Sequence, residues 1–238
     1  MSIASKPLYL QVRDALIDLI SRGSWKPGFQ IPGETELARE VGVSSGTVRK
    51  ALELMESQGL IVRRQGRGSF VADPDLEELA GRYTRLFGSE GRRVPSRTAK
   101  AITIERCPAN SFECSRLQLQ AGADVYRIRR VREDLGASFL LEDAVLPAEL
   151  FAGPLNGEDA AQEIGILAHR HGLLLGKAEE RITLGQPPHD VADLLRLARG
   201  KPIMRLERLV MIFNGRPIEW RVGYLNIDRN YYYMAGMK

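Results

Sequence analysis

The 238-residue sequence lacks the features of a membrane, secreted or disulfide-bonded protein. No run approaches the roughly 18 consecutive apolar residues of a membrane-spanning helix, and the N-terminus shows no signal-peptide pattern. Only two cysteines occur, Cys107 and Cys114, and no pair of histidines lies near them. We therefore expect a cytoplasmic protein with reduced thiols and no zinc site.

Signatures of catalysis are absent from the sequence as well. No spacing of Ser, His and Asp, of Cys and His, or of metal ligands stands out. His169 and His171 are separated by one residue, so that their imidazoles would lie on different faces of a helix. We expect no metal, no cofactor and no enzymatic activity.

The positive charge is concentrated near the N-terminus. The net charge is only +4, but residues 1–72 contain ten Lys/Arg and seven Asp/Glu. Six of these cations lie between Arg39 and Arg67, where a solvated surface would intersperse more acids. This distribution favours nucleic acid as the partner of that segment.

Residues 34–70 contain the pattern of a helix-turn-helix. Ala38, Gly42 and Val48 stand where such a unit needs a small residue, a turn and a buried side chain. The second helix lies in the major groove, with its N-terminal side chains at the base edges. The alternative is an amphipathic helical hairpin without a DNA-binding role, because this frame also occurs by chance. The candidate DNA-binding residues on this helix are Ser44, Ser45, Gly46, Thr47, Arg49 and Lys50.

A basic hairpin after these helices favours DNA binding over that alternative. Residues 60–62 and 69–71 have strand character, and the turn between them holds three arginines and two glycines. Glycines let the backbone approach a partner closely, and arginines favour an anionic partner. The candidate residues in this wing are Arg63, Arg64, Gln65, Gly66, Arg67 and Gly68. We also expect a bracing helix over 8–22 and a short strand at 29–31.

The chain changes character after residue 72. Residues 73–95 are expected to form a linker with a short helix, and residues 96–238 a second domain. Two similar segments, 125–132 and 203–210, are each followed by a glycine and predict two β-hairpins. Helices are expected over 161–172 and 189–199. This order predicts an α+β domain whose antiparallel sheet carries helices on one face.

The two hairpins place charge on an otherwise apolar face. Side chains alternate along a strand, so Arg130 and Arg132 point to the same side, and Arg208 lies in a matching row. Glu142 and Glu219 fall on the return strands. They can either neutralise the arginines internally or form a ligand pocket with them, and the residues alone favour neither.

Both halves of the chain resemble one family. Residues 7–72, with the junction ESQGLI and the wing RRQGRGSFV, resemble the winged helix-turn-helix of the GntR family of bacterial transcription regulators. The segments RIRRVR and NGRPIEWRVGYL, and the domain length, resemble the ligand-sensing UTRA domain of the HutC subfamily, which has a chorismate-lyase-like fold. The two resemblances cover nearly the whole chain.

The resemblance implies a homodimer that binds a palindromic operator in the bacterial cytoplasm. It assigns DNA contacts to Thr47, Arg49 and the wing tip. Relatives carry arginine where this chain has Thr35 and Ser45, which stay candidates for DNA contact. Each lost guanidinium removes roughly 1 to 3 kcal/mol of base discrimination. We therefore expect an operator that differs from the family consensus, or an affinity that rests on Arg49, Lys50 and the wing.

In the second domain, the resemblance implies that an effector cavity is lined by Arg130, Arg132, Glu142, Glu219 and Tyr224. Sugar-phosphate sensors of this subfamily present serine or threonine from the loop before the helix, whereas residues 157–162 here contain two acids and no hydroxyl. Acids repel a phosphate, so we expect a carboxylated or amino-bearing metabolite. The expected function is an effector-controlled repressor. The alternatives are an enzyme of chorismate-lyase-like fold and a DNA-binding protein without a ligand.

Overall fold

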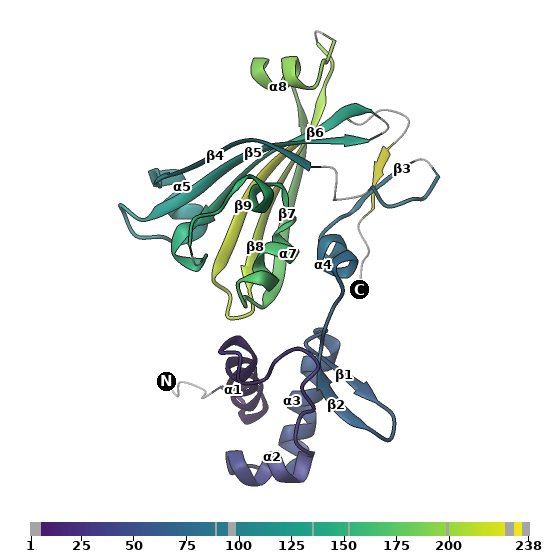
Figure 1. Cartoon of the computed structure of the whole chain (residues 1–238), viewed down its shortest axis with the longest axis vertical. Helices are drawn as coiled ribbons and strands as arrows, with labels where there is room; N and C mark the ends of the chain where they lie inside the picture. The colour runs from purple at the N-terminus through teal and green to yellow at the C-terminus, as the bar shows by residue number, and fades with distance from the viewer. Residues whose placement is uncertain are drawn as a thin grey trace, which may run out of the picture. The chain divides into compact units, whose positions relative to one another are not determined.

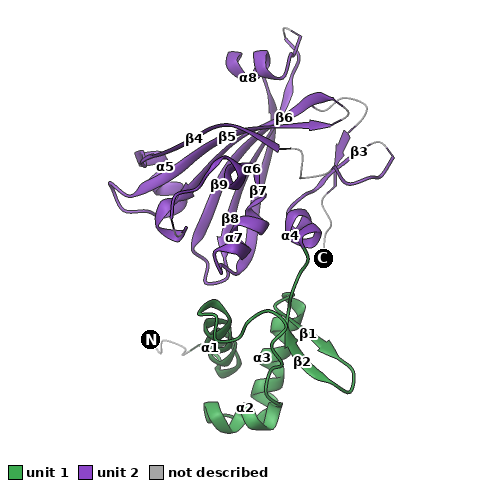
Figure 2. Ribbon diagram, in the orientation of Figure 1, with its two compact units in different colours: residues 1–75 green, residues 76–238 purple. Residues whose placement is uncertain are grey.

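The computed structural model describes residues 6–88, 90–94, 99–134, 136–151, 153–198, 200–226 and 231–234 (Figure 1). The chain forms two compact units, Met1–Asp75 and Leu76–Lys238 (Figure 2). No helix of the described part is long and apolar enough to cross a membrane.

The first unit has three helices followed by a hairpin. Its elements are α1 (Leu8–Ser21), α2 (Glu34–Val41), α3 (Ser45–Ser57), β1 (Ile61–Arg64) and β2 (Gly68–Val71). Gly42 ends α2 with a positive φ of 69°, which a residue without a side chain adopts at little cost, and the chain turns there into α3. Leu16, Leu37 and Leu52 are buried between the three helices. The expected strand at 29–31 is a single bridge between Gln30 and Phe70.

The second unit is built on a six-stranded antiparallel sheet in the order β4-β5-β6-β9-β8-β7. The strands are β4 (Ala99–Pro108), β5 (Asp124–Asp134), β6 (Ala137–Pro147), β7 (Leu175–Gly185), β8 (Ile203–Ile212) and β9 (Pro217–Leu225). The two predicted hairpins are present as β5–β6 and β8–β9, and they pair with each other through β6 and β9. The two hairpins therefore form the four inner strands of the sheet, with the return strands β6 and β9 at its centre.

Helices cover both faces of this sheet, so the expectation of helices on one face was wrong. The short helices α6 (Gly157–Ala161) and α7 (Ile164–Arg170) pack on the face that carries Tyr126 and Ile128. The opposite face is covered by α5 (Ser111–Leu117) and α8 (His189–Leu194). Side chains alternate along a strand, so the odd-numbered residues of β5 and β6 point to the opposite face from Tyr126 and Ile128. The helix α8 packs on these odd-numbered residues.

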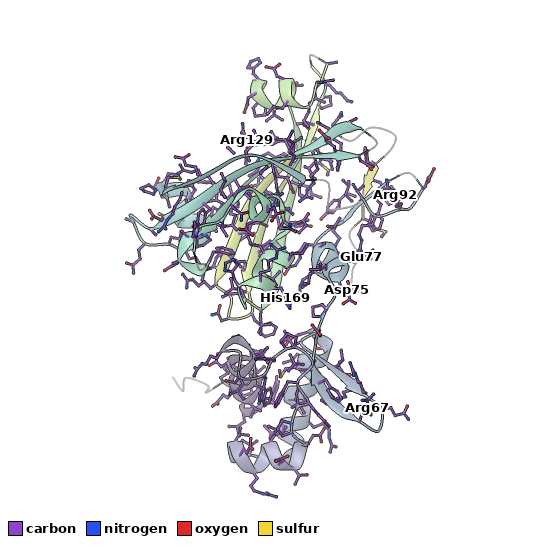
Figure 3. The ribbon with its side chains drawn as sticks, viewed as in Figure 1. Arg67, Asp75, Glu77, Arg92, Arg129 and His169 are labelled. Atoms are coloured by element: carbon purple, nitrogen blue, oxygen red, sulfur yellow. The ribbon has the colours of Figure 1, made fainter. Side chains whose placement is uncertain are left out.

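Salt bridges join α8 to that second face. Arg129 of β5 donates from Nε to Asp143 and from Nη1 to Asp190 of α8, at 2.7 Å in each case. Figure 3 labels Arg129 on its strand. Within the expected helix over 161–172, only α7 is helical beyond residue 161, and an extended Gln162 separates it from α6. A further short 3-10 helix, η2, spans Ala148–Leu150.

Residues 76–88, part of the expected linker, belong to the second unit. The helix α4 (Leu76–Gly81) packs against α7, and β3 (Leu86–Gly88) pairs with β10 (Tyr231–Tyr233). A Cβ added at Gly165 of α7 would lie 2.0 Å from the Leu79 carbonyl oxygen of α4, so this contact requires glycine. The chain thus enters the second unit immediately after Asp75.

Candidate functional site

The first candidate site is the N-terminal end of α3. Ser44 caps this helix, because its hydroxyl accepts a hydrogen bond from the Thr47 backbone N–H at 3.2 Å. The Ser44 and Thr47 hydroxyls also lie 2.9 Å apart. Ser45 is half-buried, whereas Gly46 and Thr35, in the first turn of α2, are exposed. The predicted small residues therefore lie at the N-terminal ends of α2 and α3.

The two cations of α3 are held by other elements of the first unit. Arg49 donates from Nε to Glu34 Oε2 at 2.8 Å, and this hydrogen bond raises the pKa of the guanidinium. The Lys50 ammonium lies 4.2 Å from the ring centroid of Tyr9 on α1, a cation–π contact. Both side chains belong to exposed residues, so a polyanion can reach them.

The wing presents its backbone and cations at a tight turn. The Arg67 N–H donates to the Arg64 carbonyl at 2.9 Å, and Gly66 and Gly68 adopt positive φ angles of 70° and 100°. The Arg64 guanidinium lies over the Phe70 ring. Figure 3 labels Arg67 at the hairpin. The remaining predicted wing residues, Arg63 and Gln65, are also exposed.

The second candidate site is a cluster of charges buried on one face of the sheet. Arg130, Arg132, Arg208 and Arg221 are each at most 4% exposed. They lie with three buried glutamates, Glu142, Glu163 and Glu219. Charges removed from water to this extent must be paired with one another or with a ligand.

Glu142 is the centre of this cluster. Its Oε2 accepts from Nε of Arg130 and of Arg132 at 2.8 Å each, and its Oε1 lies 2.7 Å from Nη1 of Arg221. Burial alone would raise the pKa of this carboxyl group, but the charges of Arg132, Arg221 and Arg130 hold that pKa well below its ordinary value. The internal pairing of Glu142 with the arginines, one of the two alternatives that the sequence left open, is present.

Glu163 was not among the predicted site residues. It stands before α7, where its carboxylate lies 2.5 Å from Nη2 of Arg132 and 3.3 Å from Nη1 of Arg221. These two arginines lower the pKa of Glu163 against the opposing effect of burial. Arg221 was also missed, although it follows Glu219 by two residues and therefore shares its face.

Glu219 is buried but makes longer contacts. It lies 3.7 Å from Nη2 of Arg130 and 3.9 Å from Nε of Arg221, and its Oε2 has no hydrogen-bond partner among the described groups. Arg130 also donates to the Ala160 and Gln162 carbonyls, at 3.2 and 2.5 Å. Arg130 therefore fastens the α6–α7 segment to the sheet.

A pocket lies beside this cluster. It encloses about 510 Å³ of empty space, including its mouth. Its charged lining comprises Arg85, Arg132, Glu142, Glu163, Arg208 and Arg221, and its apolar walls include Leu86, Val94, Phe139, Leu140, Leu206 and Leu225. Thr84 and Tyr233 complete the lining. The mixture of apolar walls with convergent polar groups is typical of small-molecule sites.

The structure places three predicted effector residues differently. Arg130 and Glu219 are buried in the cluster but are not among the described residues that line the pocket. Tyr224 is paired with Leu141 and packs on the opposite face of the sheet, near α8. Glu219 and Tyr224 are separated by an odd number of positions, which puts them on opposite faces of one strand.

The segment that follows α4 forms one wall of the pocket. Thr84, Arg85 and Leu86 line it, and the buried Arg208 donates from Nη2 to the Tyr83 carbonyl at 2.6 Å. The Tyr83 hydroxyl in turn donates to the Gly176 carbonyl at 2.8 Å.

Comparison with known proteins identifies the two units. Residues 8–71 match the model of the bacterial regulatory proteins of the gntR family, and residues 95–230 match the UTRA domain. The chain belongs to the GntR family and carries a UTRA domain. The resemblance noted from the sequence is confirmed, and the chain is a DNA-binding transcriptional regulator.

Two relatives match over most of the chain. The mannosyl-D-glycerate transport/metabolism system repressor MngR of Escherichia coli is 26% identical over 94% of this chain and 93% of its own. The histidine utilization repressor of Pseudomonas putida is 28% identical over 85% of this chain and 81% of its own.

Solved structures share the fold. YydK of Bacillus subtilis, described as a possible transcriptional regulator, superposes with a TM-score of 0.57 at 21% identity and covers 98% of this chain and 100% of its own. PhnF from Mycobacterium smegmatis gives a TM-score of 0.51 at 23% identity over 92% of this chain and 95% of its own.

Within the described part of the chain, no group of three or more His, Cys, Asp or Glu could hold a metal ion.

Proposed function

We propose that this protein is a repressor that binds a palindromic operator as a homodimer and is controlled by a small carboxylate bound in the UTRA domain. The observation that carries the proposal is the pocket whose charged wall is continuous with the buried arginine–glutamate cluster. Relatives named as repressors over nearly the whole chain support the direction of regulation.

Operator contacts are assigned to the start of α3 and to the wing. Arg49 and Lys50 supply charge beside the small polar group of Ser44 to Thr47, and the wing adds Arg64 and Arg67. Because Thr35 and Ser45 are not arginines, the cations of α3 and of the wing supply most of the affinity. This predicts strongly salt-dependent binding.

The pocket favours a carboxylate over an amine. Four lining arginines face only two lining glutamates. Both oxygens of Glu142 and both of Glu163 are already paired with arginines, so an ammonium group would have to share each carboxylate with a guanidinium. The apolar walls suit an effector with an apolar body, and guanidinium groups bind carboxylates in a planar, charge-assisted geometry.

The wall formed by residues 84–86 offers a route by which effector binding would change the affinity for the operator. These residues follow α4, which begins directly after the DNA-binding unit. An effector that draws Arg208 toward itself would weaken the hydrogen bond to the Tyr83 carbonyl. Binding would then favour a different placement of this segment and lower operator affinity.

The test combines DNA binding with a carboxylate screen. An operator is selected from a random duplex pool, and its affinity is measured by fluorescence anisotropy across a salt series, with and without small carboxylates found by thermal shift. We expect salt-dependent specific binding that a carboxylate weakens and that leaves the carboxylate chemically unchanged. Failure to select any sequence, or turnover of the carboxylate, would contradict the proposal.

A pocket-filling variant locates the effector. Leu206→Trp places a larger side chain at the apolar wall, whereas Ile182→Trp changes its cross-strand neighbour, a residue of β7 that is not among the described lining residues. We expect the first variant to lose the carboxylate response by at least about tenfold and to keep operator affinity. Equal responses of the two variants would place the effector elsewhere.

A further inference from the structure

One acidic residue lies among the candidate DNA-binding cations. Glu34 is the first residue of α2, and its Oε2 accepts the hydrogen bond from Arg49 Nε at 2.8 Å. Its Oε1 lies 4.0 Å from Nη2 of Arg63 on β1. The side chain of Glu34 is 28% exposed and that of Arg49 is 60% exposed. A single carboxylate therefore joins the recognition helix to the wing.

The same carboxylate borders an open groove. The groove lies between the start of α2 and the wing, and its lining includes Gly33, Glu34, Arg63, Gln65 and Gly68. Arg63 is also paired with Glu56 of α3, at 3.2 Å. The charges thus alternate in the order Arg49, Glu34, Arg63, Glu56 from the recognition helix to the wing and back.

We propose that Glu34 is a specificity-determining residue of operator recognition, acting as a positioning residue for Arg49 and Arg63. This inference rests on the proposed DNA-binding role of α3 and the wing. In the free protein, Glu34 holds the Arg49 guanidinium by a hydrogen bond and attracts that of Arg63 from 4.0 Å. A duplex that draws Arg49 to a phosphate leaves the Glu34 carboxylate without its partner and close to a polyanion, which is repulsive.

The effect of Glu34 on affinity differs between operator and random DNA. Random DNA offers mainly phosphate contacts, and these must compete with Glu34 for each arginine. The operator adds base contacts that the held arrangement of Arg49 favours. Glu34 therefore weakens non-specific binding more than specific binding, and its charge raises the ratio of the two affinities.

The experiment compares Glu34→Gln with Glu36→Gln. Glu36 is an exposed acid of the same helix, and for it the described part of the chain shows no ion pair. Both variants change the net charge equally. Affinities of the full chain are measured for the operator selected by the wild type and for a scrambled duplex of equal length, across a salt series.

We expect Glu34→Gln to tighten binding to the scrambled duplex roughly threefold to tenfold more than Glu36→Gln does, with the operator-to-scrambled ratio falling by a similar factor. In an Arg49→Ala background, the effect of Glu34→Gln should shrink, because one partner is gone. Equal effects of the two variants, or an unchanged ratio, would overturn the inference. A wild-type protein that selects no operator would instead overturn the proposed function.

Discussion

The substitution Glu142→Gln tests the buried cluster most directly. It keeps the shape of the side chain and removes the charge that three arginines share. Arg130, Arg132, Arg221 and Glu142 are all at most 4% exposed, so these groups have little access to water. Removing one partner of a buried ion pair costs about 3 to 5 kcal/mol, because it leaves an uncompensated buried charge. We expect a loss of that size in the UTRA domain.

A matched control separates this loss from the chemical change itself. Glu149→Gln is the same substitution in the 3-10 helix η2 that follows β6, where Glu149 is paired with Arg216 and its side chain is 60% exposed. Exposed pairs contribute about 0 to 1 kcal/mol. We therefore expect only a small change in the free energy of unfolding for this control.

The assay uses the distribution of the two tryptophans. Trp25 lies in the first unit and Trp220 in the second, so a Trp25→Phe background reports urea unfolding of the UTRA domain alone. The free energy of unfolding is compared among the background protein, Glu142→Gln and Glu149→Gln. A loss below about 1 kcal/mol for Glu142→Gln, or one equal to that of the control, would refute the argument that these arginines depend on Glu142.

Three further predictions follow from individual contacts. Arg49→Ala should lower operator affinity and make the dependence of log K on log salt less steep, which an anisotropy salt series measures. Gly165→Ala should destabilise the UTRA domain by about 1 to 2 kcal/mol in thermal unfolding, because its Cβ would meet the Leu79 carbonyl, whereas Gly157→Ala meets nothing within 4 Å and should be nearly neutral. The pKa values of Glu142 and Glu163 are lowered in the folded state, so their charged forms stabilise the domain above about pH 4.5, and this stabilisation is lost as the pH decreases below that value. The urea midpoint reported by Trp220 should therefore decrease from about pH 5 to about pH 3, and a constant midpoint would contradict this.

The DNA-binding unit could be predicted because its signals are local. Gly42 turns the chain and Ser44 caps α3 through bonds that span only a few residues. The glycines of the wing mark the positions where positive φ is needed. Sequence could not show that Glu34 engages Arg49, because fifteen positions separate them and only the packing of α2 against α3 brings them together.

Arg130 and Arg132 could be placed on one face from the sequence, because side chains alternate along a strand, and Glu142 could be placed on the return strand of the same hairpin. Tertiary structure decided what meets them there. Glu163 lies in the turn before α7, and its position beside Arg132 depends on how the helices pack on the sheet. The same packing leaves Tyr224 under α8 on the opposite face and makes Thr84 to Leu86 a wall of the pocket. Local spacing therefore set the charges of the site, whereas long-range packing set their partners and the space beside them.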